Sequence, residues 1–170
     1  MATIIHTAES NFQPNLNKID GFRLLTDTLR TNKGVNPQYL NFDVRKLMPG
    51  EFNAPYHYHR YADELFYIIS GTAELRTCDG LSKVSAGDIL FFEAGECGAH
   101  QLYNCGAEPC VYLDMRSYIG HDVCIYPDSN KLITIPEGEI FQLDNQCDYF
   151  EGETNPLQRR NADTYLKGKE

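Results

Sequence analysis

Apolar and polar residues alternate from residue 39 onward, and this period of two predicts β-strands. In YLNFDVRKLMP (residues 39–49), Leu40, Phe42 and Val44 alternate with polar side chains, as in a strand with one buried face. Further short runs follow at near-regular spacing, namely residues 56–60, 64–71, 72–78, 81–85, 88–93, 100–104, 110–117 and 131–135. Almost none of this region has a helical period, so the pattern predicts an all-β sandwich or barrel.

Two of these runs carry more specific information. Asp79-Gly80 stands between the runs TAELRTC and LSKVS and is typical of a two-residue hairpin turn. The run ELFYIIS (residues 64–70) is apolar on both faces, with Phe66 and Ile68 sharing one of them. A strand of this kind is covered on both sides. We expect one face to line the barrel interior and the other to meet a second subunit or the N-terminal extension.

The pattern divides the chain into three parts. Residues 1–36 are polar and mixed, and we expect them to form an N-terminal extension that packs on the barrel; within them, IDGFRLLTDTLR suits a short helix or a strand. Residues 37–136 hold the strand-like runs and form the predicted barrel. Residues 137–170 are acidic and irregular, and are expected to form a C-terminal segment that is partly frayed.

Composition narrows the classes of function. The 170 residues carry a net charge of −9, which disfavours nucleic acid and anionic membrane surfaces as partners because both need a basic face. No apolar stretch is long enough to span a bilayer, and the first residues lack the pattern of a signal peptide. The six cysteines contain no CxxC pair, so we expect reduced thiols and a cytoplasmic protein.

Residues 56–71, YHYHRYADELFYIISG, contain a candidate metal site. His57 and His59 stand two positions apart and therefore project from the same face of a strand. A tight turn through residues 61–63 would bring Glu64 back beside them on the next strand. Imidazole and carboxylate together suit divalent Zn, Fe, Mn, Ni or Co. Taken alone, however, an HxH pair with a nearby glutamate is more often a pair of half-exposed histidines at a strand edge.

A second block downstream changes that balance, because the two blocks together resemble the paired motifs of the cupin superfamily. The first motif is a glycine, HxH, a glutamate and a glycine, and the second is a glycine, a PxG-like turn, a histidine and an asparagine. The matching residues here are Gly50, His57, His59, Glu64, Gly71, Gly87, Glu93-Ala94-Gly95, His100 and Asn104. Two departures stand out: Glu93 replaces the usual proline, and the stretch from Gly95 to His100 is two residues longer than usual.

The resemblance implies a double-stranded β-helix, the jelly-roll barrel of cupins. It also implies that His57, His59, Glu64 and His100 are metal ligands that point into the barrel. Three histidines and one carboxylate leave coordination positions open for water or a substrate, which is the arrangement of a catalytic rather than a structural site. Together with the doubly apolar strand, the resemblance further implies a homodimer.

Residues beside the ligands supply the rest of the candidate pocket. Arg45, Tyr56 and Asn104 are candidates to line it, although fixing a turn suits Asn104 better. Cys97 lies in the loop before the last histidine, next to an acidic residue that works against a thiolate, so we interpret it as structural. The segment YPDSNK (residues 126–131) has the composition of a turn.

Several functions fit such a site. The first hypothesis is a metal-dependent enzyme that acts on a small polar metabolite as an isomerase, dioxygenase or lyase. A sugar-phosphate isomerase would need a base and a cationic anchor for the phosphate; Arg45 and Arg76 form no evident cluster in the sequence, which weakens that choice, whereas the ligand set also permits an Fe(II) dioxygenase. The alternatives are a non-catalytic module that binds or senses a small molecule, and an assembly domain with a vestigial site.

Overall fold

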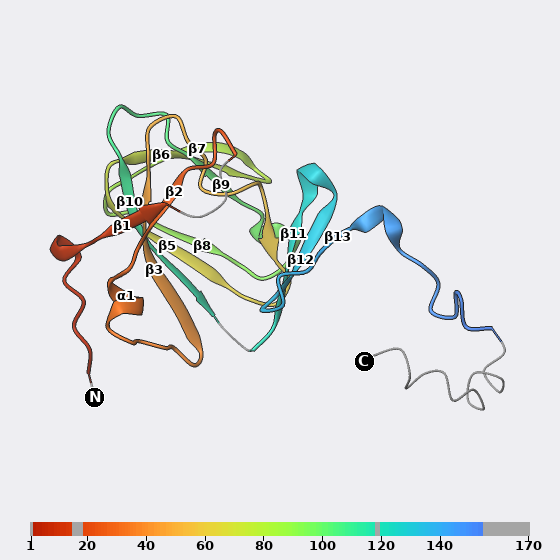
Figure 1. Ribbon diagram of the computed structural model, residues 1–170. Coiled ribbons are helices and arrows are strands. Elements are labelled where there is room, and N and C mark those ends of the chain that lie inside the picture. The colour runs from red at the N-terminus through yellow and green to blue at the C-terminus, as the bar shows by residue number, and fades with distance from the viewer. Residues whose placement is uncertain (1, 15–18, 118–119, 155–170) are drawn as a thin grey trace.

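The computed structural model describes residues 2–14, 19–117 and 120–154, and nearly all of its regular structure is antiparallel strand (Figure 1). The largest sheet has six strands in the order β1 (Phe12–Pro14), β2 (Leu24–Asp27), β3 (Leu40–Leu47), β10 (Cys110–Ser117), β5 (Glu64–Ser70) and β8 (Ile89–Phe92). A four-stranded sheet has the order β13 (Ile140–Gln142), β12 (Lys131–Ile135), β11 (Asp122–Tyr126) and β4 (Tyr58–His59). A three-stranded sheet has the order β7 (Gly80–Ser85), β6 (Thr72–Thr77) and β9 (Gln101–Tyr103). The all-β prediction is therefore confirmed.

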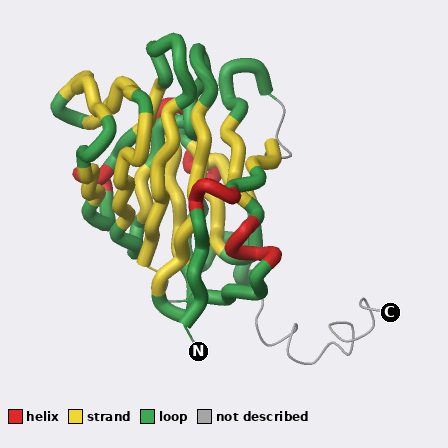
Figure 2. The backbone as a smooth tube through the Cα atoms, turned by 90° about the vertical axis from the view of Figure 1, so that its left-hand side faces the viewer, coloured by secondary structure: helices red, strands yellow, loops and turns green. Residues whose placement is uncertain are grey.

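Helical segments are short in the part of the chain that the structure describes. They are α1 (Leu29–Asn32) and the 3-10 turns η1 (Thr7–Glu9), η2 (Glu96–Gly98), η3 (Pro127–Ser129) and η4 (Leu143–Asn145). Figure 2 shows that these turns lie among long runs of strand that pass side by side. Within the described residues no helix has the length and apolar character needed to cross a membrane.

The strand pairing follows the local signals of the sequence. Strands β6 and β7 form the hairpin expected at Asp79-Gly80, and Thr77 pairs with Gly80 across its end. Gly80 has a φ of 118°, a conformation that glycine adopts without the steric cost of a side chain. The sequence therefore predicts the hairpin, but its two-residue loop is Cys78-Asp79, one position earlier than the expected Asp79-Gly80.

The hydrophobic core lies between the sheets. Strand β5 contributes Phe66 and Ile68, which are 2% and 0% exposed. The Phe66 ring packs against Tyr112 of β10 and Phe92 of β8 at centroid distances of 4.8 and 5.1 Å. The buried cluster comprises Leu47, Phe66, Ile68, Ala73, Val84, Leu90, Phe92, Leu102, Cys110 and Tyr112. The inward face of ELFYIIS thus lines the barrel interior as its alternation predicts.

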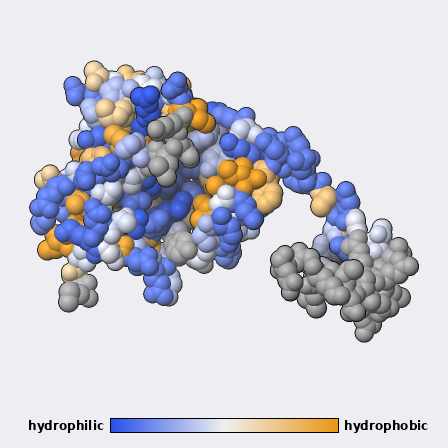
Figure 3. All heavy atoms as spheres, in the orientation of Figure 1, coloured by the Kyte–Doolittle hydropathy of each residue, from blue (hydrophilic) through white to orange (hydrophobic). Residues whose placement is uncertain are grey.

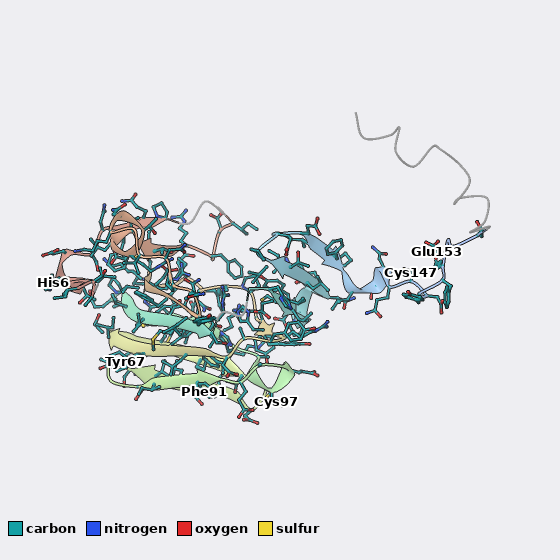
Figure 4. The ribbon with its side chains drawn as sticks, turned by 90° about the horizontal axis from the view of Figure 1, so that it is seen from below. His6, Tyr67, Phe91, Cys97, Cys147 and Glu153 are labelled. Carbon is teal, nitrogen blue, oxygen red and sulfur yellow. The ribbon has the colours of Figure 1, made fainter. Side chains whose placement is uncertain are left out.

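The opposite face of the same sheet carries large apolar side chains that remain exposed. Tyr67 of β5 and Phe91 of β8 are labelled on this outer face in Figure 4, and they are 40% and 58% exposed. Ile89, which pairs with Tyr67, is 66% exposed. Strands β1 and β2 do not cover these residues, because they extend the sheet beyond β3, on the far side of β10.

The two end segments each add strands to the barrel. IDGFRLLTDTLR, whose period is ambiguous in the sequence, forms β2 followed by the single turn α1. Strand β13, within the segment expected to be irregular, pairs with β12, and beyond it the chain leads away from the barrel (Figure 1). The expectation of fraying at 155–170 falls outside the described residues. The three-part division of the chain stays a prediction.

Candidate metal centre

Three histidines and one glutamate meet in the barrel interior. His57 lies just before β4 and His59 is the last residue of β4. A tight turn then returns the chain to Glu64 at the start of β5. His100 joins them because residues 57 and 100 form a β-bridge with backbone N–H···O distances of 3.2 and 2.8 Å. All four residues are buried. The strand alternation and the second motif thus bring together the residues they single out.

The polar atoms of these side chains converge on one point. Glu64 Oε2 lies 3.1 Å from His100 Nε2, 3.5 Å from His59 Nε2 and 4.0 Å from His57 Nε2. The His57 and His100 rings are 4.6 Å apart between centroids. A single ion placed between them is within reach of all four side chains.

The other nitrogen of each ring faces an oxygen that can only accept a hydrogen bond. The contacts are from His57 Nδ1 to the Pro55 carbonyl at 2.9 Å, from His100 Nδ1 to the Gly98 carbonyl at 2.9 Å, and from His59 Nδ1 to Asp122 Oδ2 at 2.5 Å. Each Nδ1 is therefore suited to carry a hydrogen, which leaves Nε2 facing the centre as the atom that binds a metal. Histidines that bind metals are oriented by this kind of contact.

Two of the converging atoms lack a hydrogen-bond partner. Glu64 Oε2 and His100 Nε2 are fully buried and unsatisfied within the described residues, although they are only 3.1 Å apart. With Nδ1 as the protonated nitrogen, both atoms are acceptors, so they repel each other unless a cation lies between them. A buried polar group left without a partner costs about 1–3 kcal/mol. A bound cation removes this conflict.

The charge states of the site also suit a metal. Burial, with a smaller contribution from His100, lowers the pKa of His57 to about 3, so this ring is neutral at neutral pH. Burial opposes ionisation of Glu64, but the surrounding imidazoles, His100 foremost and then His59 and His57, outweigh burial and hold the pKa of Glu64 well below its usual range. Neutral imidazoles and an ionised carboxylate are the forms that bind a divalent ion.

The residues present therefore fit a divalent transition metal. The ligand atoms of His57, Glu64 and His100 all lie within 4.8 Å of one another, as do those of His57, His59 and Cys124. Three imidazoles and one carboxylate suit Zn, Fe, Mn, Ni or Co. The same set leaves positions open for water or a further ligand, which is the property of a catalytic metal site.

A cavity of about 260 Å³ adjoins the four side chains. In Figure 3, hydrophilic residues line the hollow in the middle of the molecule, and an apolar patch lies beside it near β11 and β12. The cavity is lined by Leu24, Arg45, Asn53, Ala54, His57, His59, Glu64, Phe66, Tyr112, Asp114, Arg116, Cys124, Tyr126, Ile133 and Ile135. A small polar molecule is therefore able to approach the metal ligands from this side.

Charged residues of both signs lie in the cavity wall. Arg45 Nε lies 3.1 Å from Asp114 Oδ2, and Arg116 Nη1 lies 3.3 Å from His59 Nε2. Burial raises the pKa of Asp114 to about 6, with help from the charge of Glu64 and against the opposing charges of the two arginines. A carboxyl with a pKa near neutrality is able to give or take a proton, and arginines suit an anionic group.

The structure places the other sequence candidates differently. Arg45 lines the cavity, but Tyr56 does not; its ring packs under the Arg76 guanidinium, 4.0 Å from the ring centroid. Asn104 also lies outside the lining. It is fully buried, and its amide donates to the Leu47 and Glu108 carbonyls, which is the turn-fixing role that the sequence favours.

The longer stretch before His100 forms the turn η2. Its Gly98 carbonyl is the acceptor for His100 Nδ1, so the turn orients a candidate ligand. A Cβ at Gly98 would lie 1.9 Å from the Glu93 carbonyl oxygen, and hence only glycine fits here. Cys97 of this turn is exposed and does not reach the cavity beside the metal ligands.

Sequence reasoning missed three residues of the site. Asp122, which contacts His59, is 63 positions further along the chain, and no local motif in the sequence predicts this contact. Asp114 and Arg116 share the inward face of CVYLDMRS with Tyr112, so strand alternation was a usable signal for both. Arg116 is a second arginine in the cavity, beside Arg45, and the sequence analysis did not identify it.

Comparison with known proteins supports the fold and the domain. A family model described as a cupin domain matches residues 44–116. No curated protein matches the chain. The stretch that the family model matches contains all four candidate ligands.

Solved structures show the same architecture. An Acidithiobacillus ferrooxidans protein assigned as a sugar phosphate isomerase is 22% identical, with a TM-score of 0.73 over 87% of this chain and 95% of its own. A cupin-superfamily sugar phosphate isomerase from Silicibacter pomeroyi is 18% identical, with a TM-score of 0.72 over 88% and 98%. A predicted oxalate decarboxylase from Thermotoga maritima is 20% identical, with a TM-score of 0.56 over 69% and 100%. At these identities the similarity shows a shared fold. The double-stranded β-helix is confirmed, and residues 44–116 of this chain match the model of a cupin domain.

Proposed function

We propose that this cupin binds a divalent transition metal through His57, His59, Glu64 and His100. The observation that carries the proposal is the convergence of four acceptor atoms, two of them buried without a partner. Asp122 orients the His59 ring. When bound, the ion supplies Lewis acidity and an open coordination position beside the cavity.

We further propose that the metal centre acts on a small polar metabolite that carries an anionic group. Arg45 and Arg116 stand in the wall of the 260 Å³ cavity and suit recognition of a carboxylate or phosphate. Asp114, with its raised pKa, lies in the same wall and is placed to move a proton. Two structures of similar fold are named sugar phosphate isomerases, and the cavity arginines meet the need for a cationic anchor for the phosphate. Among isomerase, dioxygenase and lyase, these features favour the isomerase.

Elemental analysis tests the metal. The purified full-length chain is expected to carry one transition-metal equivalent, and His57→Ala and His59→Ala variants are expected to lose it. His121→Ala is the matched control, because His121 is exposed and lies outside the cavity. Equal metal content in all four proteins would show that these histidines are not the ligands.

Turnover tests the reaction. The metal-loaded chain is incubated with phosphorylated aldoses and ketoses and with their unphosphorylated counterparts, and exchange of the C2 hydrogen with solvent is followed by NMR. Exchange confined to the phosphorylated sugars supports the proposal. Binding without exchange on any substrate would instead support the non-catalytic binding module.

We also propose that the chain forms a homodimer through the outer face of the six-stranded sheet. Tyr67, Ile89 and Phe91 form an exposed apolar patch there (Figure 4). Exposed apolar clusters of this kind mark protein interfaces. The cytoplasmic location stays a prediction.

A further inference from the structure

Cys124 lies at the edge of the proposed metal centre, on the strand that pairs with β4. Cys124 of β11 stands opposite His59 in the register of the two strands. It is 2% exposed and lines the cavity beside the four candidate ligands. The family resemblance gives this position no role.

The thiol is close enough to bind the same ion as two of the histidines. The ligand atoms of His57, His59 and Cys124 all lie within 4.8 Å of one another. Donors on one tetrahedral zinc are separated by about 3.3–3.8 Å, given bond lengths of about 2.0–2.3 Å. An inward movement of about 1 Å, which small side-chain rotations supply, closes the difference.

The surroundings of the thiol differ from those of an ordinary core cysteine. Cys110 is the other buried cysteine, and it packs inside the hydrophobic cluster away from the cavity. Cys124 is not part of that cluster and instead faces the cavity beside the candidate ligands. His57 is shared between the group that contains Cys124 and the group of His57, Glu64 and His100, whose unpartnered Glu64 Oε2 and His100 Nε2 call for a cation.

We propose that Cys124 is a fifth metal ligand, which makes this a sulfur-containing centre that prefers thiophilic ions such as zinc over manganese. The proposal rests on the metal site proposed above. On metal binding, a bond forms between Sγ and the ion, and the thiol proton leaves to solvent. Soft thiolate ligands favour Zn, whereas a site of imidazole and carboxylate alone also accepts Mn.

The thiolate changes the charge of the centre as well. Three neutral imidazoles and the Glu64 carboxylate leave a divalent ion with one net positive charge. Ligation by Cys124 cancels that charge and lowers the attraction of the ion for an incoming anion. Anion binding therefore depends on the cavity arginines, Arg45 and Arg116.

X-ray absorption at the zinc edge tests the proposal without any variant. Zinc(II) is added to the metal-free full-length chain, and one sulfur scatterer at about 2.3 Å is expected. A shell of nitrogen and oxygen alone, at one zinc per chain, overturns the role of Cys124 and leaves the metal site intact. Failure to bind zinc at all overturns both proposals.

Substitution supplies a second measurement. Cobalt(II) in the wild-type chain is expected to show a near-ultraviolet sulfur-to-cobalt charge-transfer band, which disappears in Cys124→Ser and persists in the control Cys110→Ala. Zinc affinity of Cys124→Ser is expected to fall by at least the roughly 10–100-fold that loss of an outer contact causes, with manganese affinity unchanged. A band that survives in Cys124→Ser, or an equal fall for both metals, contradicts the proposal.

Discussion

Replacement of Asp122 by asparagine should lower metal affinity by about 10–100-fold and should also cost the metal-free fold about 1–2 kcal/mol. Asp122 Oδ2 lies 2.5 Å from His59 Nδ1, and Oδ1 accepts the backbone N–H groups of Tyr61 and Val123 at 3.0 and 2.8 Å. Asparagine keeps one oxygen, which suffices for the two backbone donors, but it presents an NH₂ group to His59. Two donors then face each other, so the His59 ring must turn or move its hydrogen to Nε2.

Either change removes a lone pair from the metal centre. Loss of such an orienting contact lowers metal affinity by about 10–100-fold, which corresponds to about 1.4–2.7 kcal/mol. In the metal-free protein, the variant exchanges a charged hydrogen bond for a neutral one or for none, which costs about 1–2 kcal/mol of unfolding free energy. Titration with zinc in the presence of a competing chelator measures the first quantity, and urea unfolding of the metal-free chain measures the second.

Asp128→Asn is the matched control for this experiment. Asp128 pairs with Arg76 at 2.6 Å on the surface, where both side chains are at least 41% exposed, and it does not line the cavity. Exposed pairs of this kind contribute about 0–1 kcal/mol. Wild-type zinc affinity in Asp122→Asn, or an equal loss in Asp128→Asn, would refute the view that Asp122 sets the protonated nitrogen of His59.

Three further outcomes follow from the same structure. Burial lowers the pKa of His57 to about 3, so the unfolded chain takes up a proton near pH 6.5 that the folded chain does not. The metal-free fold should therefore lose stability as pH falls from about 6.5 toward 3. Urea unfolding at pH 7 and pH 5 should show a smaller loss of stability for His57→Gln than for the wild type. Gly98→Ala should displace the turn that holds His100, because its Cβ meets the Glu93 carbonyl, and zinc affinity measured by calorimetry should fall; an unchanged affinity would show that the turn does not orient the ring. Phe91→Asp should convert a dimer into a monomer in sedimentation velocity, and a wild-type sedimentation coefficient in the variant would exclude this face as the interface.

Strand alternation predicts which side chains share a face among residues that are close in the sequence. His57 and His59 share a face because side chains repeat every two residues, and Glu64 returns to them through a short turn. His100 required a second motif, because a β-bridge across 43 positions leaves no local trace. The local pattern therefore predicts a strand and the side chains that share its face, but it does not predict which other strands pair with it.

Asp122 is a second residue whose role in the site depends on strand pairing that the local pattern does not predict. Its contact with His59 exists because β11 pairs with β4, and the residues between them give no sign of that pairing. The N-terminal segment IDGFRLLTDTLR stayed ambiguous in the sequence for a different reason. Leu24, Leu25 and Leu29 satisfy both a helical and a strand period, and the chain uses each in turn, as β2 and then α1.

The three oxygens that hold the histidine rings differ in what mutation is able to change. Those facing His57 and His100 are the main-chain carbonyls of Pro55 and Gly98, which every amino acid carries. Only the oxygen facing His59 belongs to a side chain, that of Asp122. A single substitution is able to displace the two carbonyls, as at Gly98, but it cannot replace them by another chemical group, whereas the group that faces His59 can be replaced. Among these three contacts, residue 122 is therefore the position at which evolutionary or laboratory substitution changes the acceptor itself rather than only its place.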